Sequence, residues 1–93
     1  MKIFKYSLPT TPGGQSLQIP KGFQIHGPAQ LQAGTPVFWA LVDPAVPPGQ
    51  CGVMCVATGQ DVTFPASATR IPLGTVQLPN SGLVLHYYIL VMP

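Results

Sequence analysis

Prolines and glycines divide this chain into segments that are too short for ordinary α-helices. The sequence has 93 residues, of which 12 are proline and 10 are glycine. Proline breaks a helix because it lacks the backbone N–H and its ring clashes with the preceding turn. The longest segment free of both residues, Leu83 to Met92, is rich in β-branched and aromatic residues, which favour strands. The chain is therefore predicted to be all-β.

The spacing of the prolines indicates how long the strands are. Five prolines recur at intervals of eight residues, at Pro12, Pro20, Pro28, Pro36 and Pro44. Because the flanking residues do not repeat, the interval indicates strand length rather than an internal repeat. We expect about seven short strands in a single domain, residues 1–93, folded as a small β-sandwich or a partly closed barrel. The length excludes a second domain.

Apolar patterns place the individual strands. Residues 2–8 alternate between apolar and polar faces, and residues 16–33 do so over a longer, bent stretch. The segment 37–42 is apolar throughout, which is typical of a central strand covered on both faces. Further extended segments are expected at 52–58, 62–64, 73–78 and 83–92, the last two joined by a tight turn at 79–82.

Three large aromatic residues have predicted positions. Trp39 lies in the apolar segment and is expected to anchor the core, because an indole buries a large area and needs only one hydrogen-bond acceptor. Tyr87 and Tyr88 are adjacent in the last strand, so their rings must face opposite sides of the sheet. One of them is expected in the core, and the other, with Tyr88 as the candidate, is free for an interface.

Charged residues are scarce, and their scarcity excludes several classes of function. Only 6% of the chain is charged and glutamate is absent, whereas an ordinary domain is about one quarter charged. The four basic residues are scattered, so they form no groove that could neutralise several phosphates of a nucleic acid. A surface with so little charge is expected to be covered by another protein, either a second copy or a different partner. The charged residues are Lys2, Lys5, Lys21, Asp43, Asp61 and Arg70.

The sequence also bears on location. No apolar segment is long enough to cross a bilayer as a helix, so no membrane partner is expected. Lys5 interrupts the apolar residues at the N-terminus and Pro9 follows, which leaves no apolar core for a secretion signal. The protein is expected to stay where it is made or to be carried inside a particle.

Glutamines replace charged residues along the predicted strands. In the alternating stretch the apolar residues occupy odd positions and the glutamines even ones. A row of amides can donate and accept hydrogen bonds without like-charge repulsion, which suits a surface that meets another protein. The alternative is a merely solvated face. The candidate contacts are Gln18, Gln24, Gln30 and Gln32, together with Arg70 and Tyr88.

The two cysteines are predicted to be reduced thiols. Cys51 and Cys55 would point the same way from an extended strand, roughly 13 Å apart, which is too far for a disulfide. With His26 and His86 they could supply four zinc ligands, but this spacing matches no strong zinc motif. Two buried thiols are the preferred interpretation, so no metal site is expected.

The sequence contains no catalytic motif. It has no nucleophile elbow, no glycine-rich phosphate loop and no pair of neighbouring carboxylates. His86 is interpreted as a strand histidine bonded to backbone or water, with a pH sensor or ligand-binding group as the alternative. We therefore expect neither enzymatic activity nor a bound cofactor.

Five segments, spread in order along most of the chain, together resemble a known family of proteins. They resemble a family of small proteins from tailed-bacteriophage genomes that have no known function. The resemblance implies a phage accessory or virion-associated protein with a single β-rich domain. The segments are Ile3 to Tyr6, Trp39 to Pro44, Thr58 to Gly59, Leu73 to Leu78 and Gly82 to His86.

The resemblance and the low charge together give two functional expectations. The first is a non-enzymatic phage protein that self-associates or docks, as a capsid-decorating or cementing subunit of the virion. Strands beginning near Met1 or ending near Pro93 could then add to a neighbour's sheet. The second is a protein of the host cytoplasm that blocks a host protein or sequesters a nucleotide immune signal. In that case a homo-oligomer could bring several copies of Arg70 together.

Overall fold

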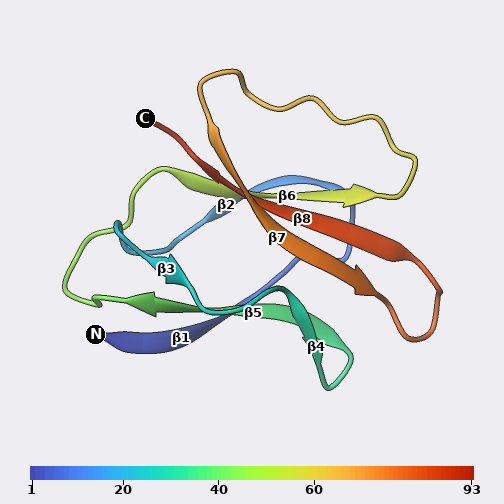
Figure 1. Ribbon diagram of the computed structural model, residues 1–93, viewed down its shortest axis with the longest axis horizontal. Coiled ribbons are helices and arrows are strands. Elements are labelled where there is room, and N and C mark those ends of the chain that lie inside the picture. The colour runs from blue at the N-terminus through green and yellow to red at the C-terminus, as the bar shows by residue number, and fades with distance from the viewer.

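Eight strands form two antiparallel sheets that pack face to face (Figure 1). The computed structural model describes all residues, Met1–Pro93. It contains no helix, which confirms the all-β prediction, and the two sheets form a sandwich that does not close into a barrel. The strands are β1 (Lys2–Ser7), β2 (Gly13–Leu17), β3 (Gln24–Ile25), β4 (Gln30–Gln32), β5 (Thr35–Val42), β6 (Cys51–Ala57), β7 (Thr69–Gln77) and β8 (Val84–Val91).

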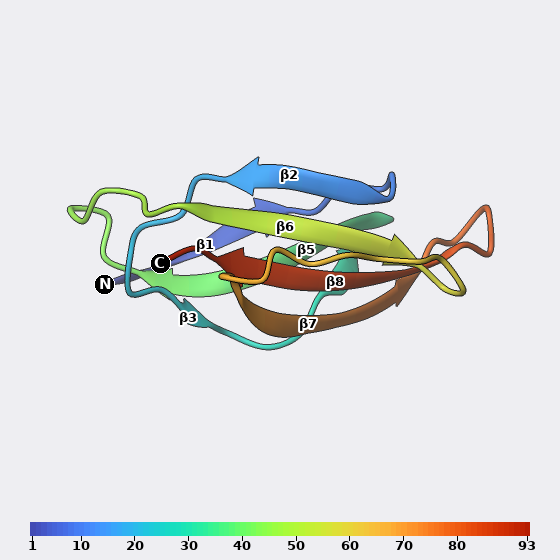
Figure 2. The ribbon, with the colours of Figure 1, turned by 90° about the horizontal axis from the view of Figure 1, so that it is seen from above.

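Sheet A contains only strands from the first half of the chain, whereas sheet B combines β2 with the three strands of the second half. In sheet A, β5 is central, with β1 on one side and both β3 and β4 on the other. Sheet B has the order β2, β6, β8, β7, and Figure 2 shows β2 and β7 at its opposite borders. The last strand, β8, is therefore interior, and the prediction that the strand ending near Pro93 offers a free edge is wrong.

Some predicted boundaries differ from the observed ones. The predicted stretch 16–33 is three short strands, the first of which begins earlier than expected, at Gly13. The expected extended piece at 62–64 is not a strand. The expected turn at 79–82 is confirmed, because the Leu78 N–H donates to the Leu83 carbonyl oxygen and closes the β7–β8 hairpin at 2.9 Å.

The core lies between the sheets and follows the strand alternation. Even-numbered residues of β5 face it from sheet A, and odd-numbered residues of β8 face it from sheet B. Strand alternation sends the neighbouring residues to the outer faces. The buried core residues are Leu8, Leu17, Ile19, Ala29, Phe38, Ala40, Val42, Val53, Cys55, Leu73, Val76, Leu85, Tyr87 and Ile89.

Trp39 lies on the opposite face from its predicted one. Phe38 fills the core beneath β5, where it stacks on Tyr6 with ring centroids 5.2 Å apart. Trp39, one residue later, is half-buried on the outer face of sheet A and is no part of the core cluster. The prediction that Trp39 anchors the core is therefore wrong, and the strand is covered fully on one face only.

Tyr87 links the core to the corner between the two sheets. Its side chain is 1% exposed, and its hydroxyl donates to the Pro9 carbonyl oxygen at 2.7 Å. Pro9 lies in the segment that leads from β1 in sheet A to β2 in sheet B. Burial, with a further contribution from Cys55, raises the pKa of Tyr87 well above its usual range. Tyr87 is thus the core member of the tyrosine pair, as expected for one of the two.

A backbone hydrogen bond links the two sheets along one long side of the sandwich. The Ala29 N–H, just before β4, donates to the Leu73 carbonyl oxygen of β7 at 2.8 Å. This bond joins the border of sheet A formed by β3 and β4 to the β7 border of sheet B. Consequently β1 and β2, the remaining two border strands, lie along the other side.

Candidate functional site

The outer face of sheet A carries an apolar strip bordered by amides. The β1–β5 register places Lys5 beside Trp39, and the β3–β5 register places Gln24 beside Leu41. Directly paired residues share a face, so the side chains of alternate residues gather here. Ile3 is 51% exposed on this face, so it is open to solvent. The residues of this face, called the glutamine face below, are Ile3, Lys5, Ser7, Gln24, Gln30, Gln32, Thr35, Val37, Trp39 and Leu41, of which Val37 is buried.

Charge is nearly absent from the glutamine face. Its one charged side chain, Lys5, donates from Nζ to Oε1 of Gln32 at 2.8 Å. The three glutamines are exposed on the β3 and β4 side of β5, while Trp39 and Leu41 are half-buried on β5 itself. The face therefore offers an aromatic and aliphatic centre with amide groups along one side and Lys5 on the other.

The four predicted glutamine contacts do not form one row. Gln24, Gln30 and Gln32 lie on the outer face of sheet A, as paired neighbours of β5. Gln18 follows β2 and belongs to the other sheet's border. The chain passes from sheet B to sheet A between these positions, where the Lys21 N–H donates to the Pro47 carbonyl oxygen at 3.1 Å. The alternation of apolar residues and glutamines continues through this crossover. The even-numbered glutamines before and after it nevertheless belong to different sheets.

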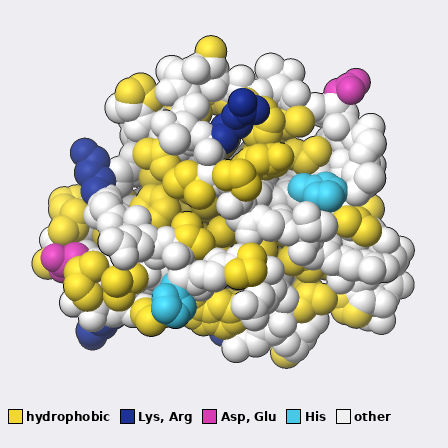
Figure 3. Space-filling model, in the orientation of Figure 1, with side chains coloured by type: hydrophobic (Ala, Val, Ile, Leu, Met, Phe, Trp, Pro, Cys, Tyr) yellow, Lys and Arg dark blue, Asp and Glu magenta, His cyan; other side chains and the backbone are white.

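The other predicted contacts, Arg70 and Tyr88, are engaged by a loop. Residues 58–68 cross the outer face of sheet B between β6 and β7 (Figures 1 and 2). Phe64 of this loop packs edge-on against Tyr88, with centroids 5.0 Å apart. The Arg70 guanidinium lies 4.6 Å from the centroid of the same Phe64 ring, at cation–π distance. Figure 3 shows the basic side chains on one face well separated, so they form no cationic patch there.

His86 fastens the same loop to sheet B. Its Nε2 lies 2.7 Å from the hydroxyl of Thr58, and its Nδ1 lies 2.9 Å from the hydroxyl of Thr75. A neutral imidazole donates from one nitrogen and accepts at the other, and a hydroxyl can do either. The partners of His86 are therefore two threonine side chains rather than the expected backbone or water.

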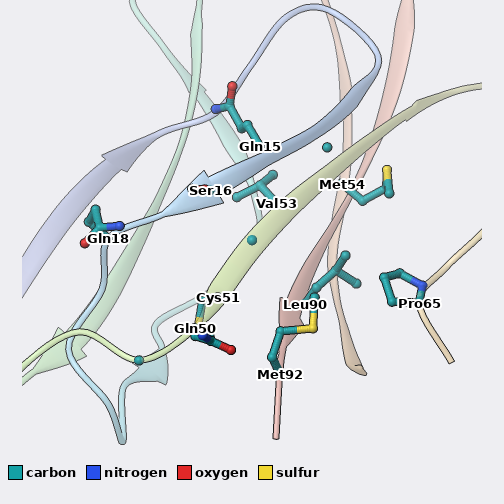
Figure 4. Close-up of a pocket in the computed structure, with 13 residues that line it drawn as sticks. Gln15, Ser16, Gln18, Gln50, Cys51, Val53, Met54, Pro65, Leu90 and Met92 are labelled. Carbon is teal, nitrogen blue, oxygen red and sulfur yellow. The ribbon is translucent and has the colours of Figure 1, made fainter. Parts of the chain in front are cut away.

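A groove lies beside the β2 border of sheet B (Figure 4). It has a volume of about 600 Å³ and is lined by Met54, Leu90, Met92 and Pro65 on its apolar side. Figure 4 shows Leu90, Met92 and Pro65 together on one side, with glutamines from the β2 region opposite. Its floor contains Gly52, where an added Cβ would lie only 3.1 Å from the carbonyl oxygen of the neighbouring strand's Gln15.

The groove was not anticipated from the sequence. The available signal was a pair of glycines, Gly14 and Gly52, at outward positions of neighbouring strands. Without a strand pairing, nothing in the sequence says that these two positions are adjacent. Only the pairing of β2 with β6 shows that these two glycines, which have no side chains, leave a recess between the strands.

The cysteines are free thiols on the inner face of sheet B. Cys55 is buried and Cys51 half-buried, and burial raises the pKa of both thiols. A raised thiol pKa disfavours the nucleophilic thiolate. His86 projects from the opposite face of the same sheet, so it does not pair with either thiol. The structure groups no three His, Cys, Asp or Glu residues as metal ligands.

Comparison with known proteins identifies the family but no activity. The chain belongs to the family described as domain of unknown function (DUF7352), whose model matches residues 1–92. No curated protein and no solved structure matches the chain. No helix of the structure is long and apolar enough to cross a membrane.

Proposed function

We propose that this protein is a non-catalytic binding subunit that docks the glutamine face against another protein. The observation that carries the proposal is the half-buried Trp39 at the centre of an open, almost uncharged sheet face. Aromatic residues are enriched at interfaces, and the centres of interfaces are depleted of charge. Tryptophan is also among the residues that most often dominate binding energy.

The glutamines supply the polar border of this surface. Gln24, Gln30 and Gln32 are exposed along one side of the Trp39 centre and can each donate and accept hydrogen bonds. A partner therefore meets hydrogen-bonding groups without the cost of burying charge. This arrangement distinguishes the glutamine face from the outer face of sheet B, which the loop 58–68 partly covers.

The virion of a tailed bacteriophage is the setting we propose for this docking. The sequence segments that resemble small phage proteins support this setting, and a low-charge docking face suits a subunit that decorates or cements a capsid. Mass spectrometry of purified particles tests the setting directly. Absence of the chain from mature particles would refute the virion role and favour the alternative, a docking partner among host proteins in the infected cell.

A nucleotide-sequestering role has less support in the site geometry. The hollow at Arg70, about 350 Å³, contains no second charged residue, and the guanidinium is already held against Phe64. Tight capture of phosphate groups normally uses several convergent donors. A thermal-shift screen with cyclic nucleotides would reveal such binding as a rise in melting temperature, and we expect none.

Substitution of Trp39 tests the docking face. Trp39→Ala should weaken binding to particles that lack the protein by about 30-fold or more, the effect of losing an interface hot spot of about 2 kcal/mol. The fold should persist because Trp39 is outside the core cluster. Val62→Ala is a matched control, since Val62 is an exposed apolar residue on the loop over sheet B. Equal binding by both variants would exclude the glutamine face.

A further inference from the structure

The four borders of the two sheets differ in how they are protected against pairing with another strand. On the β7 border, Pro72 offers no N–H, and a register shift lies between Pro72 and Gly74. The border formed by β3 and β4 consists of strands of two and three residues. Short, bulged or proline-bearing borders resist addition of another strand. The borders that remain, β1 and β2, lie together on the other side.

Hydrogen-bond alternation shows which backbone groups of β1 are free. The Leu8 N–H donates to the Pro36 carbonyl oxygen at 2.9 Å, at the end of the β1–β5 ladder. Bonded and non-bonded pairs alternate in an antiparallel ladder, so the even-numbered residues of β1 bond to β5. The odd-numbered residues, Ile3, Lys5 and Ser7, direct their N–H and C=O groups to the free edge.

The same argument applies to β2. The Met92 N–H donates to the Gln50 carbonyl oxygen at 2.9 Å, which continues the β6–β8 ladder. The even-numbered residues of β6 therefore bond to β8, and its odd-numbered residues bond to β2. In β2, the free N–H and C=O groups are those of Gly14 and Ser16.

We propose that two copies of the chain pair β1 of each with β2 of the other, as a two-fold symmetric dimer. In Figure 2 the two strands run in opposite directions, one in each sheet. A two-fold axis along the strands and between the sheets would place each β1 antiparallel to the second copy's β2. Both sheets would then continue across the dimer, and the same β1–β2 pairing would occur twice, once in each sheet. This interface uses the backbone edges of the border strands; it shares Ile3 and Lys5 with the glutamine face but does not involve Trp39 on the central strand β5.

Side-chain size and charge favour this pairing over its alternatives. The register that engages every residue of β2 sets Ile3 opposite the second copy's Ser16 and Lys5 opposite its Gly14. The large side chains of Ile3 and Lys5 would then lie beside the small residues Ser16 and Gly14, which border the groove. No charged side chain would lie opposite one of the same sign. The pairing also covers Ile3 and Phe4, which are 51% and 39% exposed.

The two alternative dimers are less complementary. Pairing β1 with β1 would gather Lys2 and Lys5 of both copies on adjacent strands, which like-charge repulsion disfavours. Pairing β2 with β2 would oppose only small outward residues, Gly14 and Ser16, and would leave the apolar β1 edge open.

A proline substitution at the free edge tests the dimer. Ser16→Pro removes an N–H that faces away from β6, so the hydrogen bonds between β2 and β6 stay intact. The hydrogen bond from this N–H to β1 of the second copy is lost. Sedimentation equilibrium should show a wild-type dimer whose dissociation constant rises roughly tenfold or more in Ser16→Pro. Gln77→Pro is the matched control, because the Gln77 N–H faces the β7 border and its neighbour Leu78 bonds across the hairpin. Circular dichroism verifies that each variant is folded.

Disulfide trapping tests the register without relying on the proline variant. Hydrogen-bonded pairs have Cα atoms about 5.5 Å apart, within disulfide range, so Ile3→Cys combined with Ser16→Cys should give a covalent dimer when diamide oxidises the thiols. Within one chain these positions lie in opposite sheets, about 10 Å apart or more. Cross-linking by Ile3→Cys with Lys5→Cys, or by Gly14→Cys with Ser16→Cys, would instead indicate one of the alternative dimers. A wild-type monomer, a dimer unaffected by Ser16→Pro, or trapping only in an alternative pair would overturn the proposal.

Discussion

The hydroxyl of Tyr87 should be worth more to stability than its small size suggests. Tyr87→Phe keeps the ring in the core but removes the donor that lies 2.7 Å from the Pro9 carbonyl oxygen. That oxygen is left in a partly buried corner without its partner. Loss of one hydrogen bond, with partial desolvation of the orphaned acceptor, costs about 1–2 kcal/mol.

Thermal unfolding measures this cost. For a domain of this size, 1 kcal/mol shifts the melting temperature by about 4–8 °C, so Tyr87→Phe should melt about 4–16 °C below the wild type. Tyr88→Phe is the matched control, because Tyr88 is on the outer face and its ring contact with Phe64 survives the change. We expect the control to stay within about 0.5 kcal/mol of the wild type.

The pH dependence gives a second, independent readout. Burial raises the pKa of Tyr87 in the folded protein above the ordinary value of about 10. The neutral phenol is thus favoured by folding, and its contribution is complete below pH ~10 and declines as the pH rises above it. The advantage of wild type over Tyr87→Phe should therefore stay constant up to about pH 10 and shrink as the pH rises above it. A difference that stays constant above about pH 10, or equal destabilisation by Tyr88→Phe, would refute the reasoning.

Three further predictions concern the turn, the loop and the thiols. Ala33 has a φ of 50° in the β4–β5 turn, so Ala33→Asn should stabilise by about 0.5–1 kcal/mol in urea unfolding, while Ala66→Asn should not. His86→Leu removes both threonine contacts, so limited proteolysis should cut loop 58–68 faster; an unchanged cutting rate would contradict the anchoring role. In native protein Cys55 should react with a thiol reagent far more slowly than Cys51, and equal rates would contradict its burial.

Local patterns predicted the class of fold because they depend on neighbouring residues only. The prolines and glycines that exclude helices also mark the turns, and the 79–82 hairpin falls where its composition predicts. Period-two alternation likewise identified β1, where Tyr6 faces the core. The free thiols agree with the extended geometry expected between Cys51 and Cys55.

The positions of the candidate contacts were less predictable because alternation defines two faces without saying which is covered. In β5 both faces are apolar, so the sequence does not decide between Phe38 and Trp39 as the core residue. The packing of sheet B against the even-numbered residues decides it. Similarly, the even spacing of the glutamines does not reveal that the chain changes sheets after Gln18, so the sequence could not separate Gln18 from the other three.

The sequence by itself therefore determined that the chain is a small β-rich domain with little charge and frequent turns, since proline, glycine and side-chain alternation act over a few residues. Tertiary structure decided which side of each strand is buried, which strands are borders, and where Gly14 and Gly52 combine into a groove. These features depend on pairing between distant segments. The free edges of β1 and β2, and the exposure of Trp39, exist only once that pairing is made.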